Sequence, residues 1–138
     1  MSEEYYELRP IGFVESSLVD LASAPAQGDE GAPDARIVLR PEFVPAMRNL
    51  EPGLSIVVLT WLDRGDRTVL ELHPRDDPAR PLHGVFSTRS PDRPNPIGLH
   101  EVEIVGIDDT RIQVRNLEAI DGTPVVDIKP LLGPVSTR

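Results

Sequence analysis

Apolar and polar positions alternate over short stretches of the chain, and this pattern predicts a protein built mainly of β-strands. Ile112 and Val114 alternate with polar side chains within Arg111–Leu117, which is typical of a strand with one buried face. The preceding segment, His100–Ile107, has the composition of a strand, so the two segments predict a hairpin. Leu54–Leu62 is a continuous apolar run rich in β-branched residues, which predicts a strand covered on both faces.

Further segments add strands and one short helix. Strands are expected over Leu8–Val14, Ala35–Arg40 and Arg67–His73. Apolar residues three and four positions apart favour a helix over Pro41–Leu50, which ends before Pro52-Gly53. Many strands with one helix, and no alternation of strand and helix, predict a mainly β fold with a small sheet that is closed or nearly closed.

Length and composition limit the classes of protein to which the chain can belong. Its 138 residues fit a single domain over 1–138, which begins with an acidic tail at about 1–6 and carries no additional C-terminal domain. The absence of cysteine excludes disulfides, thiolate nucleophiles and cysteine-bound metals. No apolar run is long enough to span a bilayer, and residues 1–30 lack the layout of a signal peptide. A cytoplasmic location without a membrane partner is therefore expected.

The net charge of −9 argues against a nucleic-acid partner, although its distribution weakens the objection. Residues 1–34 hold eight acidic residues and one arginine, whereas the rest of the chain is close to neutral. Residues 64–93 hold six arginines against five acids. An arginine-bearing face can therefore still contact phosphate, although no basic stripe stands out.

Residues 84–98 form the most unusual segment, because three prolines alternate with two arginines. Each proline fixes its own φ and biases the preceding residue towards extended geometry, so the loop loses little entropy when it becomes ordered. Guanidinium groups on a stiff loop are suited to holding a carboxylate or phosphate in one orientation. The alternative is a proline-rich turn with two solvated arginines. The positions concerned are Arg89, Pro91, Arg93, Pro94 and Pro96.

A second segment, Asp121–Pro130, combines a turn with charged residues on an extended stretch. Asp and Gly at its start suit a tight or left-handed turn. Asp127 and Lys129, the only lysine of the chain, lie two positions apart and share one face of an extended segment. The pair is either functional or an exposed ion pair at the end of a strand.

Together the two segments resemble the TsaA-like family, also called TrmO, whose members are S-adenosylmethionine-dependent tRNA methyltransferases. The resemblance implies a six- or seven-stranded single-sheet barrel that forms homodimers, with S-adenosylmethionine as the cofactor and no metal. It extends over about residues 7–132. The matching stretches are Pro10–Gly12, Gly84–Pro91, Arg93–Leu99, Asp121–Pro124 and Asp127–Pro130.

The resemblance also implies which residues contact the cofactor. Arg89 is expected either to pair with the cofactor's carboxylate or to pin the loop, Asp121 to accept from its ammonium group or ribose, and Leu99 to pack on its adenine. The complete set of cofactor-binding residues expected is Pro25, Ala26, Gln27, Leu62, Asp63, Arg89, Arg93, Asn95, Leu99, Asp121, Gly122, Thr123 and Pro124.

The acceptor implied by the family is the adenine nitrogen of N6-threonylcarbamoyladenosine in tRNA. That nitrogen must lose a proton, which Asp127 is placed to accept, while Lys129 either neutralises Asp127 or contacts the acceptor's carboxylate. Ala26, Leu62 and Leu131 depart from the family pattern. Two alternatives therefore stay open: a methyltransferase of the same fold that acts on a small non-tRNA acceptor, and a non-catalytic S-adenosylmethionine-binding dimeric module.

The three histidines do not have the spacing of metal ligands, and each is expected to be an ordinary strand or loop residue. Trp61 lies within the apolar run and is expected in the core. No serine lies in the Gly-x-Ser-x-Gly context of a hydrolase.

Overall fold

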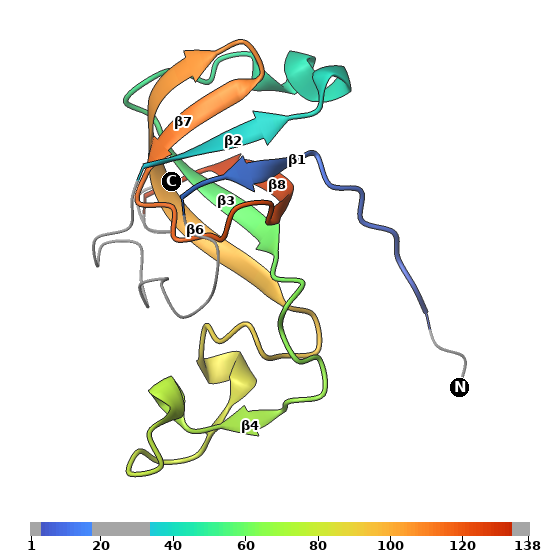
Figure 1. Cartoon of the computed structure of the whole chain (residues 1–138), viewed down its shortest axis with the longest axis vertical. Coiled ribbons are helices and arrows are strands. Elements are labelled where there is room, and N and C mark those ends of the chain that lie inside the picture. Colours follow the sequence, from blue (N-terminus) through green and yellow to red (C-terminus); the bar gives the residue numbers. More distant parts are fainter. Residues whose placement is uncertain (1–3, 18–33, 134–138) are drawn as a thin grey trace.

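The computed structural model describes residues 4–17 and 34–133, and its main feature is a closed barrel of six strands in the order β1-β2-β7-β6-β3-β8 (Figure 1). All neighbouring strands are antiparallel. The predicted mainly β barrel and the hairpin are confirmed. The apolar run Leu54–Leu62 is a strand as predicted, but only one of its faces is buried rather than both. The barrel strands are β1 (Gly12–Glu15), β2 (Ala35–Leu39), β3 (Ser55–Trp61), β6 (Ile97–Asp108), β7 (Arg111–Arg115) and β8 (Pro124–Pro130).

The barrel forms because its strands place small and β-branched apolar residues at alternate positions. In β3, Ile56, Val58 and Thr60 point inward and are fully buried, while the residues between them lie on the outer surface. In β6, Val102 and Ile104 continue the same pattern. The inward side chains of all six strands fill the interior as one core.

Closure of the barrel depends on Gly12 in β1. This residue is opposite Leu39 of β2 and also opposite Val125 of β8, so it lies at both seams of a short strand. A Cβ at this position would overlap the carbonyl oxygen of Val38 and would lie 2.9 Å from the Cα of Leu39. Glycine therefore permits the close approach of β1 and β2 that closes the sheet.

Strand direction alternates around the barrel, and this alternation decides where the connections lie. The last residues of β1, β3 and β7 and the first residues of β2, β6 and β8 all face the same end, because every neighbouring pair is antiparallel. Three connections therefore leave this end, which we call the loop end: residues 16–34, 62–96 and 116–123. The β6–β7 turn and the β2–β3 connection lie at the opposite end.

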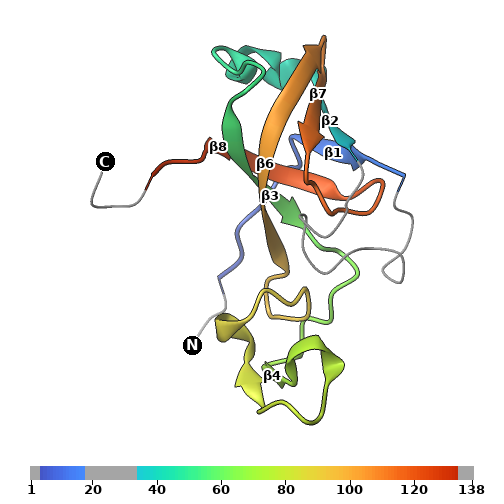
Figure 2. The ribbon, with the colours of Figure 1, turned by 90° about the vertical axis from the view of Figure 1, so that its left-hand side faces the viewer.

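The longest connection, residues 62–96, forms a small lobe that extends beyond the barrel in both views (Figures 1 and 2). The lobe contains a two-stranded sheet of β4 (Glu71–Leu72) and β5 (His83–Gly84). Two single-turn 3-10 helices flank it, η2 (Pro74–Asp76) and η3 (Val85–Ser87). The proline-rich segment closes the lobe and leads directly into β6.

Two predicted elements differ in detail from the structure. The expected strand Arg67–His73 is wrong except for the two residues of β4, because Asp66 accepts hydrogen bonds from the backbone and hydroxyl of Thr68 and so forms a local turn. The first strand begins at Gly12 rather than at Leu8, since Pro10 has no N–H for a ladder.

The helix expected over 41–50 is present as a 3-10 helix, η1 (Pro41–Met47). Pro45 lies inside it and has no N–H, so it cannot donate the hydrogen bond that an α-helix would need at this point. Arg48 instead donates to the carbonyl of Pro45 at 3.4 Å, three residues back. The hydrophobic periodicity therefore located the helix, and proline determined its type.

Candidate functional site

The proline-rich loop is held in shape from within by Arg93. Its guanidinium donates to the carbonyl of Thr88 at 3.1 Å from two nitrogens, to the carbonyl of Ser90 at 3.0 Å, and to the carbonyl of Val85. A guanidinium presents its donors in a fixed fork, so four such bonds fix the course of the loop. Arg93 was predicted to contact the cofactor; in the structure its terminal nitrogens are occupied by the loop itself.

A second arginine, Arg67, anchors the far end of the same loop. It donates to the carbonyl of Pro94 at 2.7 Å and to the side-chain oxygen of Asn95 at 3.0 Å. Its guanidinium also lies 5.3 Å from the ring centroid of Trp61, within range of a cation–π interaction. The side-chain oxygen of Asn95, another predicted cofactor contact, is thus engaged by Arg67.

The middle of the loop rests against Gly65. A Cβ on this glycine would overlap the carbonyl oxygen of Pro91 and would lie 3.1 Å from the Cβ of Pro96. Next to it, Asp92 accepts a hydrogen bond from the backbone N–H of Asp66 at 2.9 Å. Sequence reasoning missed both Gly65 and Arg67, because their role depends on contacts with residues about 26 to 28 positions away.

Arg89 differs from the other two arginines. Its side chain is exposed, and no hydrogen bond or ion pair within residues 4–17 and 34–133 engages it. The sequence left open whether Arg89 pins the loop or faces a ligand. Arg93 and Arg67 hold the loop, and the contact of Arg89 with a ligand stays a prediction.

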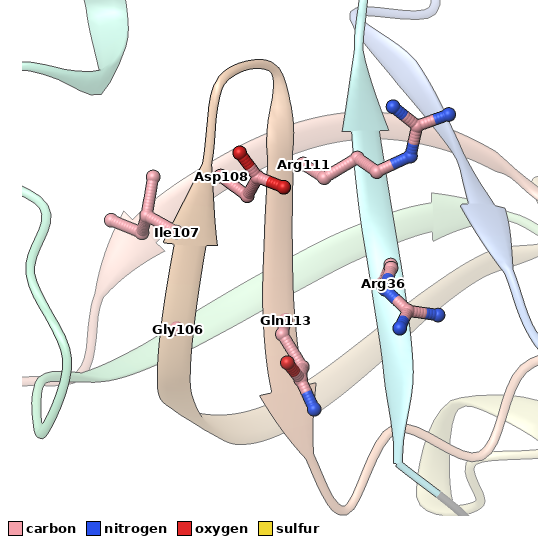
Figure 3. Close-up of a pocket in the computed structure, with 6 residues that line it drawn as sticks. All are labelled: Arg36, Gly106, Ile107, Asp108, Arg111 and Gln113. Carbon is pink, nitrogen blue, oxygen red and sulfur yellow. The ribbon is translucent and has the colours of Figure 1, made fainter.

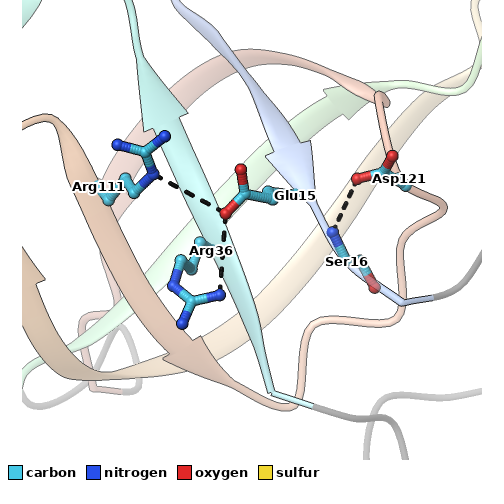
Figure 4. Close-up of polar contacts among 5 residues, drawn as sticks. All are labelled: Glu15, Ser16, Arg36, Arg111 and Asp121. Atoms are coloured by element: carbon cyan, nitrogen blue, oxygen red, sulfur yellow. Dashed lines mark hydrogen bonds and ion pairs between the residues drawn. The ribbon is translucent and has the colours of Figure 1, made fainter.

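The acidic turn between β7 and β8 is also tightly built. Gly122 has φ +85° and donates to the carbonyl of Val14 at 2.7 Å, while Val14 donates to the carbonyl of Thr123 at 2.9 Å. The hydroxyl of Thr123 donates to the carbonyl of Ile120 at 2.6 Å, so this predicted contact is engaged internally and its side chain is buried. Asp121 is exposed and accepts from the backbone N–H of Ser16 at 2.9 Å (Figure 4).

The topology brings most of the predicted cofactor-binding residues to the loop end. Leu62 and Asp63 follow β3, Leu99 lies near the start of β6, and Pro124 begins β8 beside Phe13. Arg89 and Asp121 lie on two separate connections at this end of the barrel. No hydrogen bond or ion pair among the described residues joins them. Pro25, Ala26 and Gln27 belong to the β1–β2 connection but lie outside the described residues.

The two residues predicted to be catalytic lie on a barrel strand rather than on one of the loop-end connections. Asp127 and Lys129 are on the outer face of β8, opposite Leu59 and Val57 of β3. Their side chains form an ion pair of 3.1 Å and are about half exposed. The Asp127 carboxylate also accepts from the N–H of Ile128 at 2.9 Å. Ion pairing is thus present, and the catalytic role of the two residues stays a prediction.

A buried polar pair at the loop end was not anticipated from the sequence. His100 points into the barrel, where its Nε2 lies 2.8 Å from the hydroxyl of Thr60. A Cβ on Gly98 would overlap that hydroxyl and lie 2.9 Å from the imidazole nitrogen, so glycine makes room for the pair. Burial and, to a lesser extent, the positive charge of Arg89 lower the pKa of His100 from 6.5 to about 4.

This buried histidine is expected to make stability depend on pH. The pKa of His100 is depressed in the folded protein, so at intermediate pH the unfolded chain binds one more proton than the folded protein does. Stability therefore falls as the pH drops from 6.5 towards about 4. For these two pKa values the free energy of unfolding should fall by about 2 kcal/mol between pH 8 and pH 5. Urea unfolding at both pH values measures it. The His100→Gln variant provides the control and should lose about 2 kcal/mol less; an equal loss in both proteins would contradict the assignment.

One hollow lies on the side of the barrel. It is a cavity of about 220 Å³ on the outer face of β2, β6 and β7, lined by Arg36, Gly106, Ile107, Asp108, Arg111 and Gln113 (Figure 3). Glu15 lies 3.7 Å from Arg36 and 3.8 Å from Arg111, so acidic neighbours compensate both arginines (Figure 4). A second hollow of about 410 Å³ lies in the lobe beside Ser87 and Thr88. Neither includes Arg89 or Asp121, so we place the candidate site from topology and bonding.

The described residues contain no helix long and apolar enough to cross a membrane. Within the same residues, no three histidine, aspartate or glutamate side chains gather closely enough to hold a metal ion.

Solved structures with a similar fold were found. A crystal structure of TrmO superposes with a TM-score of 0.76 at 29% sequence identity, over 96% of this chain and 57% of that protein. TrmO from Pseudomonas aeruginosa gives a TM-score of 0.72 at 28% identity. This chain therefore spans little more than half the length of these structures.

Curated relatives are more similar in sequence. A probable S-adenosyl-L-methionine-binding protein of Methanothermobacter thermautotrophicus is 43% identical over 94% of this chain and 93% of that protein. A probable S-adenosyl-L-methionine-binding protein of Archaeoglobus fulgidus is also 43% identical, but this chain spans only a third of it. The family model of the tRNA-methyltransferase O N-terminal domain matches residues 13–135. The chain belongs to the tRNA-methyltransferase O N-terminal domain family.

Proposed function

We propose that the protein binds S-adenosylmethionine at the loop end of the barrel and transfers its methyl group. The observation that carries the proposal is the convergence of three connections at one end. One of them presents Arg89, whose donors no described residue engages, while other arginines fix the loop. Relatives described as S-adenosyl-L-methionine-binding proteins support the choice of ligand.

The residues of the loop end suit the chemistry of this cofactor. Arg89 would hold the carboxylate, and Asp121 would accept from the ammonium group or a ribose hydroxyl. Leu99 is 41% exposed and Leu62 is partly exposed, so apolar surface is available for the adenine. When bound, the cofactor supplies an already activated methyl group, so the protein's task is to align the acceptor with it and to exclude water.

We further propose that the functional form is a homodimer. The outer face of β3 and β6 carries a row of apolar side chains, with Trp61 opposite Ile97 and Leu59 opposite Leu99. Ile97 is 43% exposed, and a continuous exposed apolar face is typical of an interface between protein chains. Because Leu99 belongs both to this face and to the loop end, a second copy would cover the candidate site.

As the acceptor we propose the adenine nitrogen of N6-threonylcarbamoyladenosine in tRNA, with Asp127 receiving its proton and Lys129 either neutralising Asp127 or contacting the acceptor's carboxylate. The ion pair of these residues keeps both charges together on one exposed face. The family's description as tRNA methyltransferases supports this acceptor. The net charge of −9 favours the second candidate, a smaller acceptor without a phosphate backbone.

Calorimetry with S-adenosylmethionine tests the cofactor proposal. Wild-type protein should bind it, and Arg89→Ala should weaken binding by roughly 10- to 100-fold, because a hydrogen-bonded charge pair is lost. Arg64→Ala, which changes an exposed arginine of the same lobe, is the matched control and should bind like the wild type. Absence of binding to the wild type, or equal binding by both variants, would refute the proposal.

A second measurement separates the acceptors. The protein is incubated with cofactor and with tRNA carrying threonylcarbamoyladenosine, and the tRNA nucleosides are then analysed by mass spectrometry. A gain of one methyl group on the modified adenosine supports the tRNA acceptor. Tight cofactor binding without methyl gain refutes the tRNA acceptor and favours a small acceptor or a non-catalytic module.

A further inference from the structure

The polar pair inside the loop end of the barrel has one group without a partner. His100 is 7% exposed and Thr60 is fully buried. The Nε2 of His100 is satisfied by the Thr60 hydroxyl at 2.8 Å, but its Nδ1 is buried and has no hydrogen-bond partner among the residues that the structure describes. A buried polar atom without a partner lowers the stability of the folded protein, so its presence requires an explanation, such as a role in binding.

The position of the imidazole proton follows from the hydrogen-bond inventory. A hydroxyl can donate one hydrogen, and within the described part of the chain the Thr60 hydroxyl has one partner, Nε2 of His100. If Thr60 donates, the proton of the neutral ring lies on Nδ1, and one group, the Nδ1–H, is unmatched. If Nε2 donated instead, both the Thr60 hydrogen and the Nδ1 lone pair would be unmatched. The arrangement with fewer unmatched groups makes Nδ1 a donor.

A second donor lies nearby. Arg89 is close enough for its charge to act on His100, and no described residue forms a hydrogen bond or ion pair with its guanidinium. Gly98 and Leu62 adjoin the pair, since the Cδ1 of Leu62 lies 3.1 Å from the position a Cβ on Gly98 would take. A neutral N–H and a guanidinium at one barrel end together suit an acceptor that carries negative charge.

We propose that His100, oriented by Thr60, is a specificity-determining residue that donates from Nδ1 to the carboxylate of the bound nucleoside, directly or through one ordered water, while Arg89 supplies the charge. This inference rests on the function proposed above and adds to it a residue and the ligand group that it recognises. Thr60 acts through His100, as a positioning residue.

Two substitutions separate the two ring nitrogens. The amide nitrogen of glutamine reaches the place of Nε2 and keeps a partner for Thr60, whereas that of asparagine reaches the place of Nδ1 and keeps the proposed donor. The ligands are S-adenosylmethionine and its decarboxylated form, which differ only in the carboxylate. Calorimetry measures both affinities for wild type, His100→Gln and His100→Asn, and thermal unfolding shows that each variant is folded.

His100→Gln should lose about tenfold in affinity for S-adenosylmethionine and little for the decarboxylated ligand, whereas His100→Asn should retain the preference for the carboxylate. Equal losses in both variants, or equal losses for both ligands, would overturn the inference. The proposal that the protein binds S-adenosylmethionine would not be affected by that result. Nitrogen-15 NMR of the free wild-type protein gives an independent result: a proton on Nδ1 supports the inference, and a proton on Nε2 overturns it. If the wild type binds neither nucleoside, the proposed function and this inference both fail.

Discussion

Alanine in place of Gly12 is expected to lower the free energy of unfolding by at least about 3 kcal/mol. The added Cβ would overlap the carbonyl oxygen of Val38 and crowd the Cα of Leu39, which are backbone atoms and cannot rotate away. Gly12 pairs on both sides, and β1 meets β8 through only two residue pairs, so the strand cannot shift without opening the barrel. Urea unfolding followed by circular dichroism measures the loss.

The matched control for this substitution is Gly106→Ala. Gly106 also lies in a barrel strand, but a Cβ there would have its nearest neighbour, the side-chain oxygen of Gln113, at 3.6 Å. Its cost should therefore stay below about 1 kcal/mol. If the two variants were equally stable, the close approach of β1 and β2 would not be what closes the barrel.

The second large effect is expected from Gly65→Ala, on ligand binding rather than on the barrel. The new Cβ would overlap the carbonyl oxygen of Pro91, and the prolines leave the loop few ways to adjust. Displacement of the loop would move Arg89, and a misplacement of about 1 Å commonly costs on the order of 100-fold in function. Calorimetry should thus show affinity for S-adenosylmethionine reduced by up to about 100-fold, the upper limit expected for removal of Arg89, with the barrel still folded by far-ultraviolet circular dichroism.

Gly84→Ala is the control within the same lobe. Its nearest neighbour would be the carbonyl oxygen of Leu70 at 4.0 Å, so the substitution fits without movement. Wild-type affinity is expected for this variant. Comparable losses in both variants would show that binding depends on the flexibility of the lobe in general and not on the contact between Gly65 and the proline-rich loop.

Much of the fold was predictable because it depends on local patterns. The alternation in Arg111–Leu117 and the apolar run Leu54–Leu62 correspond to β7 and β3 in the structure. The expectation for Arg67–His73 was wrong over most of its length, since Asp66 forms a turn with Thr68 and Arg67 reaches across to the proline loop. The hydrogen bond from Arg67 to the carbonyl of Pro94 cannot be inferred from the alternation of apolar and polar residues along the chain.

The candidate site was predictable in part for the same reason. The stiffness of the proline loop and the turn at Asp121 can be inferred from residue types, and Gly122 adopts the expected positive φ. The sequence does not say which arginine shapes the loop and which faces outward, because Arg93 and Arg89 differ only in their tertiary contacts. His100 was treated as ordinary, since neither its burial nor its unmatched nitrogen can be inferred from its neighbours in the chain.

Because strand direction alternates, the connections at one end of the barrel can be changed separately from those at the other end. Lengthening the turn at Asp109 or the segment around η1 leaves every connection of the opposite end in place. Exchanging all three loop-end connections together for those of a relative would transplant recognition while the six-stranded scaffold stays unaltered. Leu117 and Ala119 of the third connection pack in the core, so a chimera that retains these two residues should keep its core packing and take on the part of the donor protein's ligand preference that the connections supply.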